Sequence, residues 1–250
     1  MNFTTNKITF TSPLEGYIPS PKPATHFVPE AFKKFKTEEY PNDTVKACMP
    51  FLDTFLSGYI IPLPVGIKAK SYKTDDDKVS FSLEIVPRVR GLNGVSDLVG
   101  ITDHPLKQFP ESMIYNRAFV PHIFKFINPW KIKTPPGYSC LFTQPFNQNS
   151  DWKIIDGIVD TDKHNLEVNF PFFWTTPLKE NKDFNINSGV PMVQVIPFKR
   201  ESWKMEAKVD YEPKKRTQGI EKTDLEYLKL SGSRFKDWYK SMSWNKKSFK

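Results

Sequence analysis

A short run in the second half of the chain could bind a metal ion or move a proton. Asp160, Asp162 and His164 stand at alternate positions, so on a strand they would share one face and could ligate a metal. In a turn, Asp side chains instead accept hydrogen bonds from nearby backbone N–H groups. None of the four histidines begins a His-x-Asp or His-x-Glu pair. We favour the turn, and we expect neither a metal nor a cofactor.

Sequence patterns of known catalytic sites are missing elsewhere. The chain has no Gly-rich phosphate loop, no nucleophile elbow and no His-Glu-x-x-His, which are the patterns that place phosphates, acyl-transfer serines and zinc. Its two cysteines, Cys48 and Cys140, are too few for a disulfide framework or a Cys-rich zinc site. We therefore favour a protein without catalytic activity.

Aromatic and basic side chains alternate near the C-terminus and predict a binding surface. Such a mixture suits stacking on nucleic-acid bases, and it equally suits a protein interface, where Trp, Tyr and Arg are enriched. We favour protein partners because Asp237 and Glu226 reduce the local positive charge. The residues expected to bind the partner are Arg234, Phe235, Lys236, Trp238, Tyr239, Lys240 and Trp244.

We expect Trp238 and Trp244 to be mostly buried, against another chain or against the flank of their own domain. Two exposed indoles beside Tyr239 and Phe235 would form an apolar patch that soluble monomers seldom tolerate. Charge is concentrated in the same region. Residues 199–250 contain 15 Lys and Arg against 8 Asp and Glu, and so carry most of the formal net charge of +8.

Composition predicts a globular, mainly β protein around these residues. Of 250 residues, 38% are hydrophobic and 26% charged, which is typical of a folded domain. Pro (22) and Phe (21) are abundant while Gly (11) is scarce, a balance that favours strands joined by stiff loops over helix bundles. No apolar run approaches the roughly 18 residues that span a bilayer.

Three regions follow from the patterning along the chain. Residues 1–29 hold repeated prolines and predict an extended N-terminal arm, because proline excludes regular helix. Residues 30–198 predict a β-rich domain with one or two short helices near 30–57, and residues 199–250 a basic, aromatic C-terminal extension. The helix shows best at Cys48, Phe51, Leu52, Phe55 and Leu56, whose spacing makes one apolar face.

Strand signals fill the region after this helix. Residues 79–86 alternate with period two and place Val79, Phe81, Leu83 and Ile85 on one face. Three later segments each combine a short strand with a Pro or Gly turn. They are residues 130–142, 157–162 and 186–198.

Those three segments resemble, in that order, the β-clip core of the dUTPase and dCTP deaminase superfamily. The matching motifs lie within residues 130–200 and are Pro136-Gly137-Tyr138, Gly157-Ile158-Val159-Asp160-Thr161-Asp162 and Gly189-Val190-Pro191-Met192-Val193-Gln194-Val195-Ile196. The resemblance implies a β-clip barrel or sandwich. If the activity were shared, it would make Asp160 the general base and would place Gln194 near nucleotide phosphates.

Residues 51–200 also resemble an uncharacterised family of marine phage and bacterial proteins, which implies a phage source. The superfamily's phosphate-holding Arg-Ser-Gly stretch has no counterpart at residues 143–148, and Lys163 stands where its nucleobase-stacking Tyr would be. Its Gly-rich C-terminal motif is also missing. We therefore expect a non-enzymatic structural or assembly protein, a virion component whose two ends hold neighbouring subunits. The alternative is a dUTPase-like enzyme that binds or hydrolyses nucleotides.

The first residues, Met-Asn-Phe-Thr-Thr, lack the basic start and apolar stretch of a signal peptide. We accordingly expect no secretion through such a signal and no membrane partner. The expected location is the virion or the host cytoplasm, and the expected partners are other protein subunits.

Overall fold

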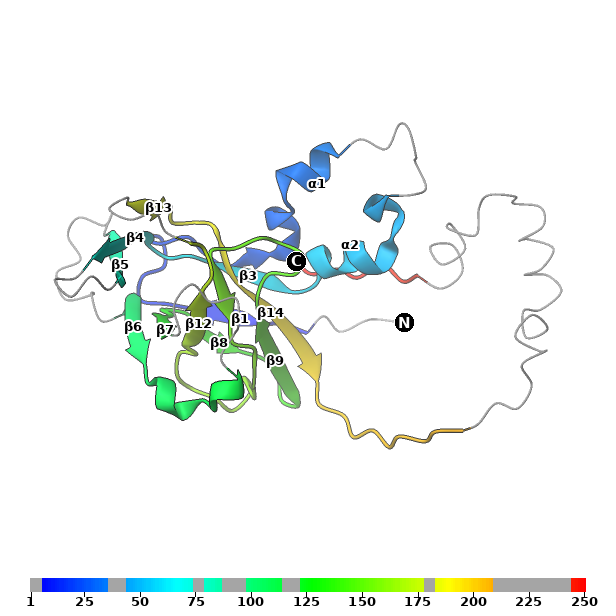
Figure 1. Ribbon diagram of the computed structural model, residues 1–250. Helices are drawn as coiled ribbons and strands as arrows, with labels where there is room; N and C mark the ends of the chain where they lie inside the picture. The colour runs from blue at the N-terminus through cyan, green and yellow to red at the C-terminus, as the bar shows by residue number, and fades with distance from the viewer. Residues whose placement is uncertain are drawn as a thin grey trace.

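The computed structural model describes residues 6–35, 44–73, 79–86, 98–113, 122–177, 183–208 and 244–250. The expected mainly β fold is confirmed, with two short α-helices and several antiparallel sheets (Figure 1). In the described residues no sheet closes into a barrel.

The largest sheet has five strands in the order β11-β9-β14-β3-β2. Its strands are β11 (Gly157–Val159), β9 (Tyr138–Thr143), β14 (Pro191–Lys199), β3 (Tyr59–Pro62) and β2 (Lys22–Pro23). The register places Val159 opposite Cys140 and Lys199 opposite Tyr138. The three segments singled out in the sequence are therefore neighbours in one sheet, although up to about fifty residues separate them along the chain.

Three smaller sheets make up the rest of the sheet structure in the described residues. The four-stranded sheet has the order β10 (Trp152–Ile154), β12 (Phe170–Trp174), β7 (Ile123–Ile127) and β6 (Gly100–His104). The three-stranded sheet consists of β13 (Phe184–Ile186), β4 (Gly66–Lys73) and β5 (Val79–Val86). The third sheet pairs β1 (Thr9–Thr11) with β8 (Lys131–Lys133). Short 3-10 turns lie at Ala24–Phe27, Val45–Ala47, Leu106–Gln108 and Glu111–Met113.

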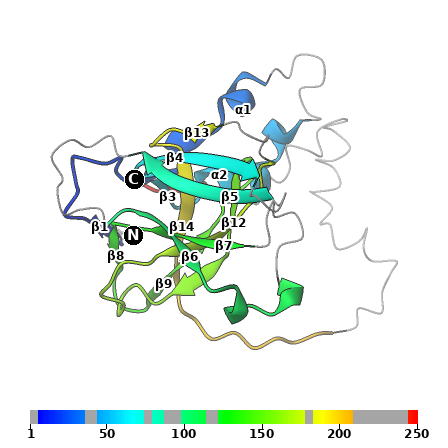
Figure 2. The same cartoon turned by 60° about the vertical axis from the view of Figure 1, so that its left-hand side comes forward.

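Aromatic side chains join the sheets into one hydrophobic core. Phe142 of the five-stranded sheet meets Phe170 of the four-stranded sheet, with ring centroids 5.5 Å apart. Phe81 of β5 meets Phe124 of β7 at the same separation. The alternation predicted for residues 79–86 is thus present, because Phe81, Leu83 and Ile85 all pack against the core. Several antiparallel sheets therefore share one core, and their ribbons lie close together in Figure 2.

The described part of the expected N-terminal arm belongs to this body. β1 pairs with β8, and β2 is an edge strand of the five-stranded sheet, where it pairs with β3. Leu14, Ile18 and Ala24 between and after these strands are buried. Prolines keep the segment extended, as expected, and the buried residues fasten it to the surface of its own domain.

The two helices lie close to the expected positions. α1 spans Glu30–Lys34, and α2 spans Met49–Leu56 with Pro50 in its first turn, where the missing N–H costs no hydrogen bond. Gly58 then turns the chain into β3 with a φ of +71°, and a Cβ there would lie 2.1 Å from the Val195 oxygen. Only glycine fits both requirements.

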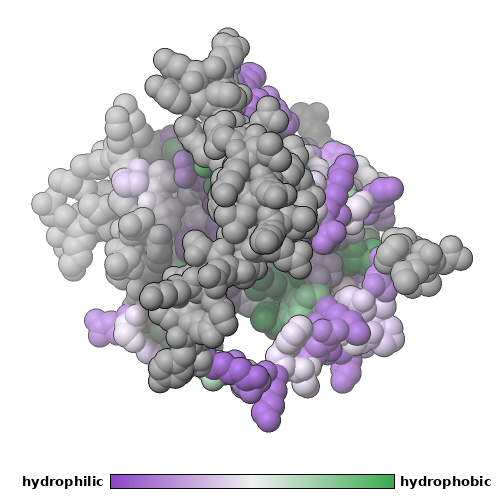
Figure 3. Space-filling view, turned by 90° about the vertical axis from the view of Figure 1, so that its right-hand side faces the viewer, coloured by the Kyte–Doolittle hydropathy of each residue, from purple (hydrophilic) through white to green (hydrophobic). Residues whose placement is uncertain are grey.

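α1 and α2 meet through aromatic rings, with the Phe32 and Phe55 centroids 5.0 Å apart. α2 lies toward the right of Figure 1, and Figure 3 shows that side of the molecule, where hydrophobic residues gather near the centre of the face among hydrophilic ones. In the part of the chain that the structure describes, no helix is long and apolar enough to cross a membrane.

Candidate functional site

Asp160 and Asp162, which the sequence offers as metal ligands or turn residues, both contact one arginine. They lie in the turn that follows β11, and Arg200 follows the last residue of β14. The Arg200 guanidinium lies 2.5 Å from an Asp162 oxygen and 3.2 Å from an Asp160 oxygen. Because β9 lies between β11 and β14, Arg200 reaches across its end and also donates to the Tyr138 carbonyl at 2.8 Å.

Asp162 is the most enclosed member of this cluster. Its side chain is 6% exposed, and one of its oxygens also accepts a 2.8 Å hydrogen bond from the backbone N–H of Gly137. The hydrogen bond from Arg200, helped by that of Gly137, holds the pKa of the Asp162 carboxyl far below its usual range. Asp162 is therefore an ionised structural anchor that ties the Pro136-Gly137 turn to the end of β14.

Asp160 is more open, with a side chain that is 55% exposed. It accepts a 2.6 Å hydrogen bond from the Ser139 hydroxyl in addition to its contact with Arg200. The Asp160 carbonyl accepts the backbone N–H groups of Lys163 and His164, which closes the turn predicted from the sequence. Among the residues that the structure describes, no three His, Cys, Asp or Glu side chains converge on a common point that could hold a metal ion.

Gln194, the second residue of the nucleotide alternative, lies elsewhere in the sheet. The residue is 1% exposed, and its side-chain oxygen accepts the Phe146 N–H at 2.9 Å. Its amide nitrogen donates to the carbonyls of Thr54 and Ser57 at 3.0 and 2.7 Å. Gln194 therefore fastens the end of α2 to β14.

The structure does not bring Asp160 and Gln194 together. Asp160 contacts Ser139, whereas Gln194 is opposite Thr143 at the other end of β9. Four residues along a strand correspond to roughly 13 Å. Both side chains are engaged in hydrogen bonds that hold the fold, so the geometry supports a structural role for each.

Buried thiol and hydroxyl groups form hydrogen bonds with Thr161, in the turn that follows β11. Thr161 donates to the Cys140 sulfur at 3.3 Å and shares a 2.7 Å hydrogen bond with Thr134. Burial raises the pKa of the Cys140 thiol to about 11. Cys140 is consequently a neutral, unreactive thiol at ordinary pH.

Of the predicted partner-binding residues, the structure describes only Trp244. Arg234, Phe235, Lys236, Trp238, Tyr239 and Lys240 lie outside the described residues. The Trp244 indole N–H points to both oxygens of Asp53 in α2, at 3.1 Å each. Lys247 forms an ion pair with the same carboxylate at 2.5 Å, and Asp53 is 15% exposed. The predicted burial of Trp244 against its own domain is met in part, because the side chain is half-buried.

The C-terminal segment, residues 244–250, contacts β3 as well as α2. The Phe249 ring packs edge-on against Tyr59 with centroids 6.0 Å apart, and the Tyr59 hydroxyl donates to the Lys250 backbone oxygen at 3.4 Å. Burial raises the pKa of Tyr59, which keeps that hydroxyl protonated. We call Asp53 and Tyr59, which bind this segment, the tail site; the segment itself forms one wall of a pocket beside Tyr59.

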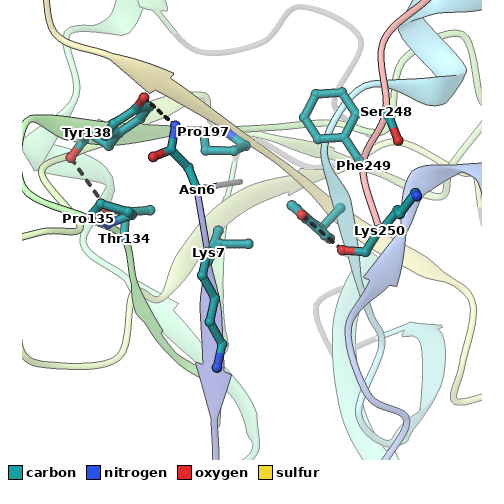
Figure 4. A pocket seen from close by; sticks show the side chains of 11 residues that line it. Asn6, Lys7, Thr134, Pro135, Tyr138, Pro197, Ser248, Phe249 and Lys250 are labelled. Carbon is teal, nitrogen blue, oxygen red and sulfur yellow. Dashed lines mark hydrogen bonds between the residues drawn. The ribbon is translucent and has the colours of Figure 1, made fainter. Parts of the chain in front are cut away.

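The pocket beside Tyr59 has a volume of about 440 Å³. Figure 4 shows Asn6 and Tyr138 pointing toward each other on one side of it, with Phe249 and Lys250 on the other. Lys7 and Ser248 also line it. Both ends of the described chain therefore contribute to one site.

Residues 201–208 lie in the expected C-terminal extension, but the sequence analysis did not single out their exposed apolar side chains. They follow β14 and lead away from the body (Figure 1), and no described strand pairs with them. Trp203 and Met205 are each 87% exposed. Their alternation, Trp203-Lys204-Met205-Glu206-Ala207, is the available signal, because it is the period of a strand with one apolar face.

Comparisons with known proteins add no assignment. No protein-family model matches the chain, and no curated protein matches it. The expectations drawn from the β-clip superfamily and from the phage family therefore rest on the sequence motifs.

Proposed function

We propose that this protein is a non-enzymatic subunit of a protein assembly and that residues 201–208 contact a neighbouring subunit. The observation that carries the proposal is the exposure of Trp203 and Met205 on a stretch of chain that leaves the sheet. Large apolar side chains exposed together mark interaction sites. Trp is also enriched among the residues that dominate binding energy at protein interfaces.

Magnitudes favour apolar contact over charge in this stretch. Burying a large apolar side chain contributes about 2–3 kcal/mol. The neighbouring ion pairs, Lys199–Glu201 at 3.1 Å and Lys208–Glu206 at 3.3 Å, are between exposed side chains, and such pairs contribute about 0–1 kcal/mol. Trp203 and Met205 should therefore anchor the contact, while the charges keep the free segment in solution.

The candidate catalytic residues form hydrogen bonds and an ion pair within the fold, which supports a role without catalysis. Asp160 is held by Ser139 and Arg200, and Gln194 has all three of its hydrogen bonds within the fold. Isothermal titration calorimetry with dUTP or dCTP analogues and magnesium should show no heat of binding. Binding that is lost in Asp160→Asn would instead support the dUTPase-like alternative.

We propose a virion as the assembly, since residues 51–200 resemble the family of marine phage and bacterial proteins. The β-rich body supports this proposal because it is a rigid platform from which exposed segments reach neighbours. The first test is whether the purified full chain associates with itself.

Sedimentation velocity across about 1–100 μM should show concentration-dependent oligomers. Trp203→Ser combined with Met205→Ser should weaken this association at least about tenfold, the equivalent of 1.4 kcal/mol. Lys204→Ser combined with Lys208→Ser changes the same segment without removing its apolar face and serves as the matched control. A full chain that stays monomeric throughout, or an apolar double variant that associates like the parent, contradicts the proposal.

A further inference from the structure

A long connection separates the C-terminal segment from the sheet that precedes it. Residues 209–243 lie between Lys208 and Trp244, and a stretch of that length spans at most about 120 Å when fully extended. The segment that occupies the tail site is therefore not confined to it by a short loop. A copy of the same segment from a neighbouring subunit has the length to reach the same site.

We propose that the C-terminal segment of one copy binds the tail site of a second copy, so that neighbouring subunits are joined by exchanged tails. This inference rests on the proposed assembly function and names the partner as another copy of this chain. Exchange of an identical element between copies creates no new contact chemistry, and it is a low-cost route to oligomers.

The side chains of the tail site match the hydrogen-bond donors and the phenyl ring of the C-terminal segment. Asp53 is a largely enclosed carboxylate that needs donors, and it receives the Trp244 indole N–H and the Lys247 ammonium together. Tyr59 adds the ring contact with Phe249 and a hydrogen bond to the backbone beyond it. An indole, an ammonium and a phenyl ring spaced over six residues of chain are required to make all these contacts.

Within an assembly, the tail of the same copy and that of a neighbour compete for each site. Tethering raises the effective concentration of a segment to millimolar values for short linkers, but this advantage falls steeply as the connection lengthens. A neighbour held by residues 201–208 supplies its own segment from a comparable distance. Binding to a second copy therefore requires only the contacts that the segment makes with Asp53 and Tyr59 of its own chain.

Two full-length variants with one accessible cysteine each can test the exchange. Both carry Cys48→Ser, because Cys48 is exposed, whereas Cys140 is buried and unreactive. One carries Ser248→Cys in the tail, and the other carries Lys7→Cys, which lines the same pocket, together with an affinity tag. The mixture, at about 100 μM, is treated with a short bismaleimide, and cross-linked pairs of tagged and untagged chains are measured by mass spectrometry.

We expect cross-linked pairs in the mixture and at least about a fivefold loss when Trp244→Ala and Phe249→Ala are added to the tail variant. Gln108→Cys, on an exposed turn, replaces Lys7→Cys as the position control and should give few pairs. A single chain carrying both Lys7→Cys and Ser248→Cys reports occupancy by its own tail. If that chain links internally while the mixture gives no pairs, the exchange is disproved.

A chain that links neither internally nor between copies also overturns the inference, because the segment is then not seated in the tail site. Sedimentation of the same samples separates this result from the proposed function. Oligomers without cross-linked pairs would leave the assembly proposal standing and remove tail exchange. Monomers in every sample would remove both.

Discussion

Arg200 and Asp162 form the interaction that fixes the end of the largest sheet. Arg200 follows β14, Asp162 follows β11, and β9 lies between these strands. A guanidinium that bonds a nearly enclosed carboxylate and a backbone carbonyl makes charge-assisted hydrogen bonds, which are stronger than neutral ones. Removing one partner should leave the other charge poorly paired.

Asp162→Asn should lower the free energy of unfolding, and the loss should depend on pH. The folded-state pKa of Asp162 lies far below its unfolded value because Arg200 and Gly137 stabilise the carboxylate. Its stabilising contribution is therefore present above the unfolded pKa of about 3.9 and declines as pH falls below that value. Urea unfolding of both proteins from pH 7 to pH 3 should show a constant difference down to about pH 5 that shrinks below pH 4.

Asp160→Asn is the matched control for that experiment. Its side chain is more than half exposed and contacts the same arginine, so its effect at pH 7 should be smaller. Two outcomes would contradict this account of Asp162. Either the two substitutions would lower the free energy of unfolding equally, or the difference between Asp162→Asn and the parent would stay unchanged down to pH 3.

At the scale of elements, Gln194 holds three pieces of structure together. Its amide bonds the last turn of α2 and the residue that follows α2, and its oxygen bonds the loop after β9. The helix itself is only Met49–Leu56, and isolated helices of that length are unstable in water. Tertiary contacts such as these must therefore maintain it.

Gln194→Met keeps the shape of the side chain and removes its hydrogen bonds. It leaves the carbonyls of Thr54 and Ser57 and the Phe146 N–H without this partner, and a buried unsatisfied group costs about 1–3 kcal/mol. We expect a loss of about 2–5 kcal/mol in the free energy of unfolding, measured by urea denaturation. Gln108→Met on an exposed turn should change stability by less than about 0.5 kcal/mol, and a comparable loss there would invalidate the interpretation.

Patterns among neighbouring residues predicted individual helices and strands such as α2 and β5. They did not predict the contacts between separate elements. Pro50 and the apolar spacing around Phe51 and Phe55 indicated α2, and strict alternation indicated β5, because both signals come from neighbouring residues. The carboxylates of the turn after β11 were also found. Their partner Arg200 was missed, because only the register that sets Lys199 opposite Tyr138 brings it to them, and register depends on pairing over long sequence separations.

At the scale of the whole molecule, the two ends of the described chain meet on one side of the sheet. Asn6, Lys7 and Ser248 line the same pocket, and β1 and β2 hold the N-terminal part in place. The predicted burial of Trp238 lies outside the described residues. Trp244 shows how such an anchor works, because its side chain is half-buried and its indole N–H donates to the Asp53 carboxylate.

Trp244→Ala should lower the free energy of unfolding by about 1–2 kcal/mol, since part of a large apolar side chain is removed from contact. Lys247→Ala should cost at most about 1 kcal/mol, because the lysine end of its ion pair is solvent-exposed. Urea unfolding at about 1 μM, in 0.05 and 0.5 M NaCl, compares the two variants. Salt should abolish the lysine effect and spare the tryptophan effect; the reverse result would mean that charge holds the tail.

The position of β14 determines when the polypeptide can fold during its synthesis. Among the described strands this one is made last, yet it lies between β9 and β3 in the middle of the five-stranded sheet. A nascent chain that has not yet emerged beyond residue 199 leaves both of those strands with unpaired edges, which are prone to aggregation. Translation must therefore proceed past residue 199 before the central sheet of the described residues can close.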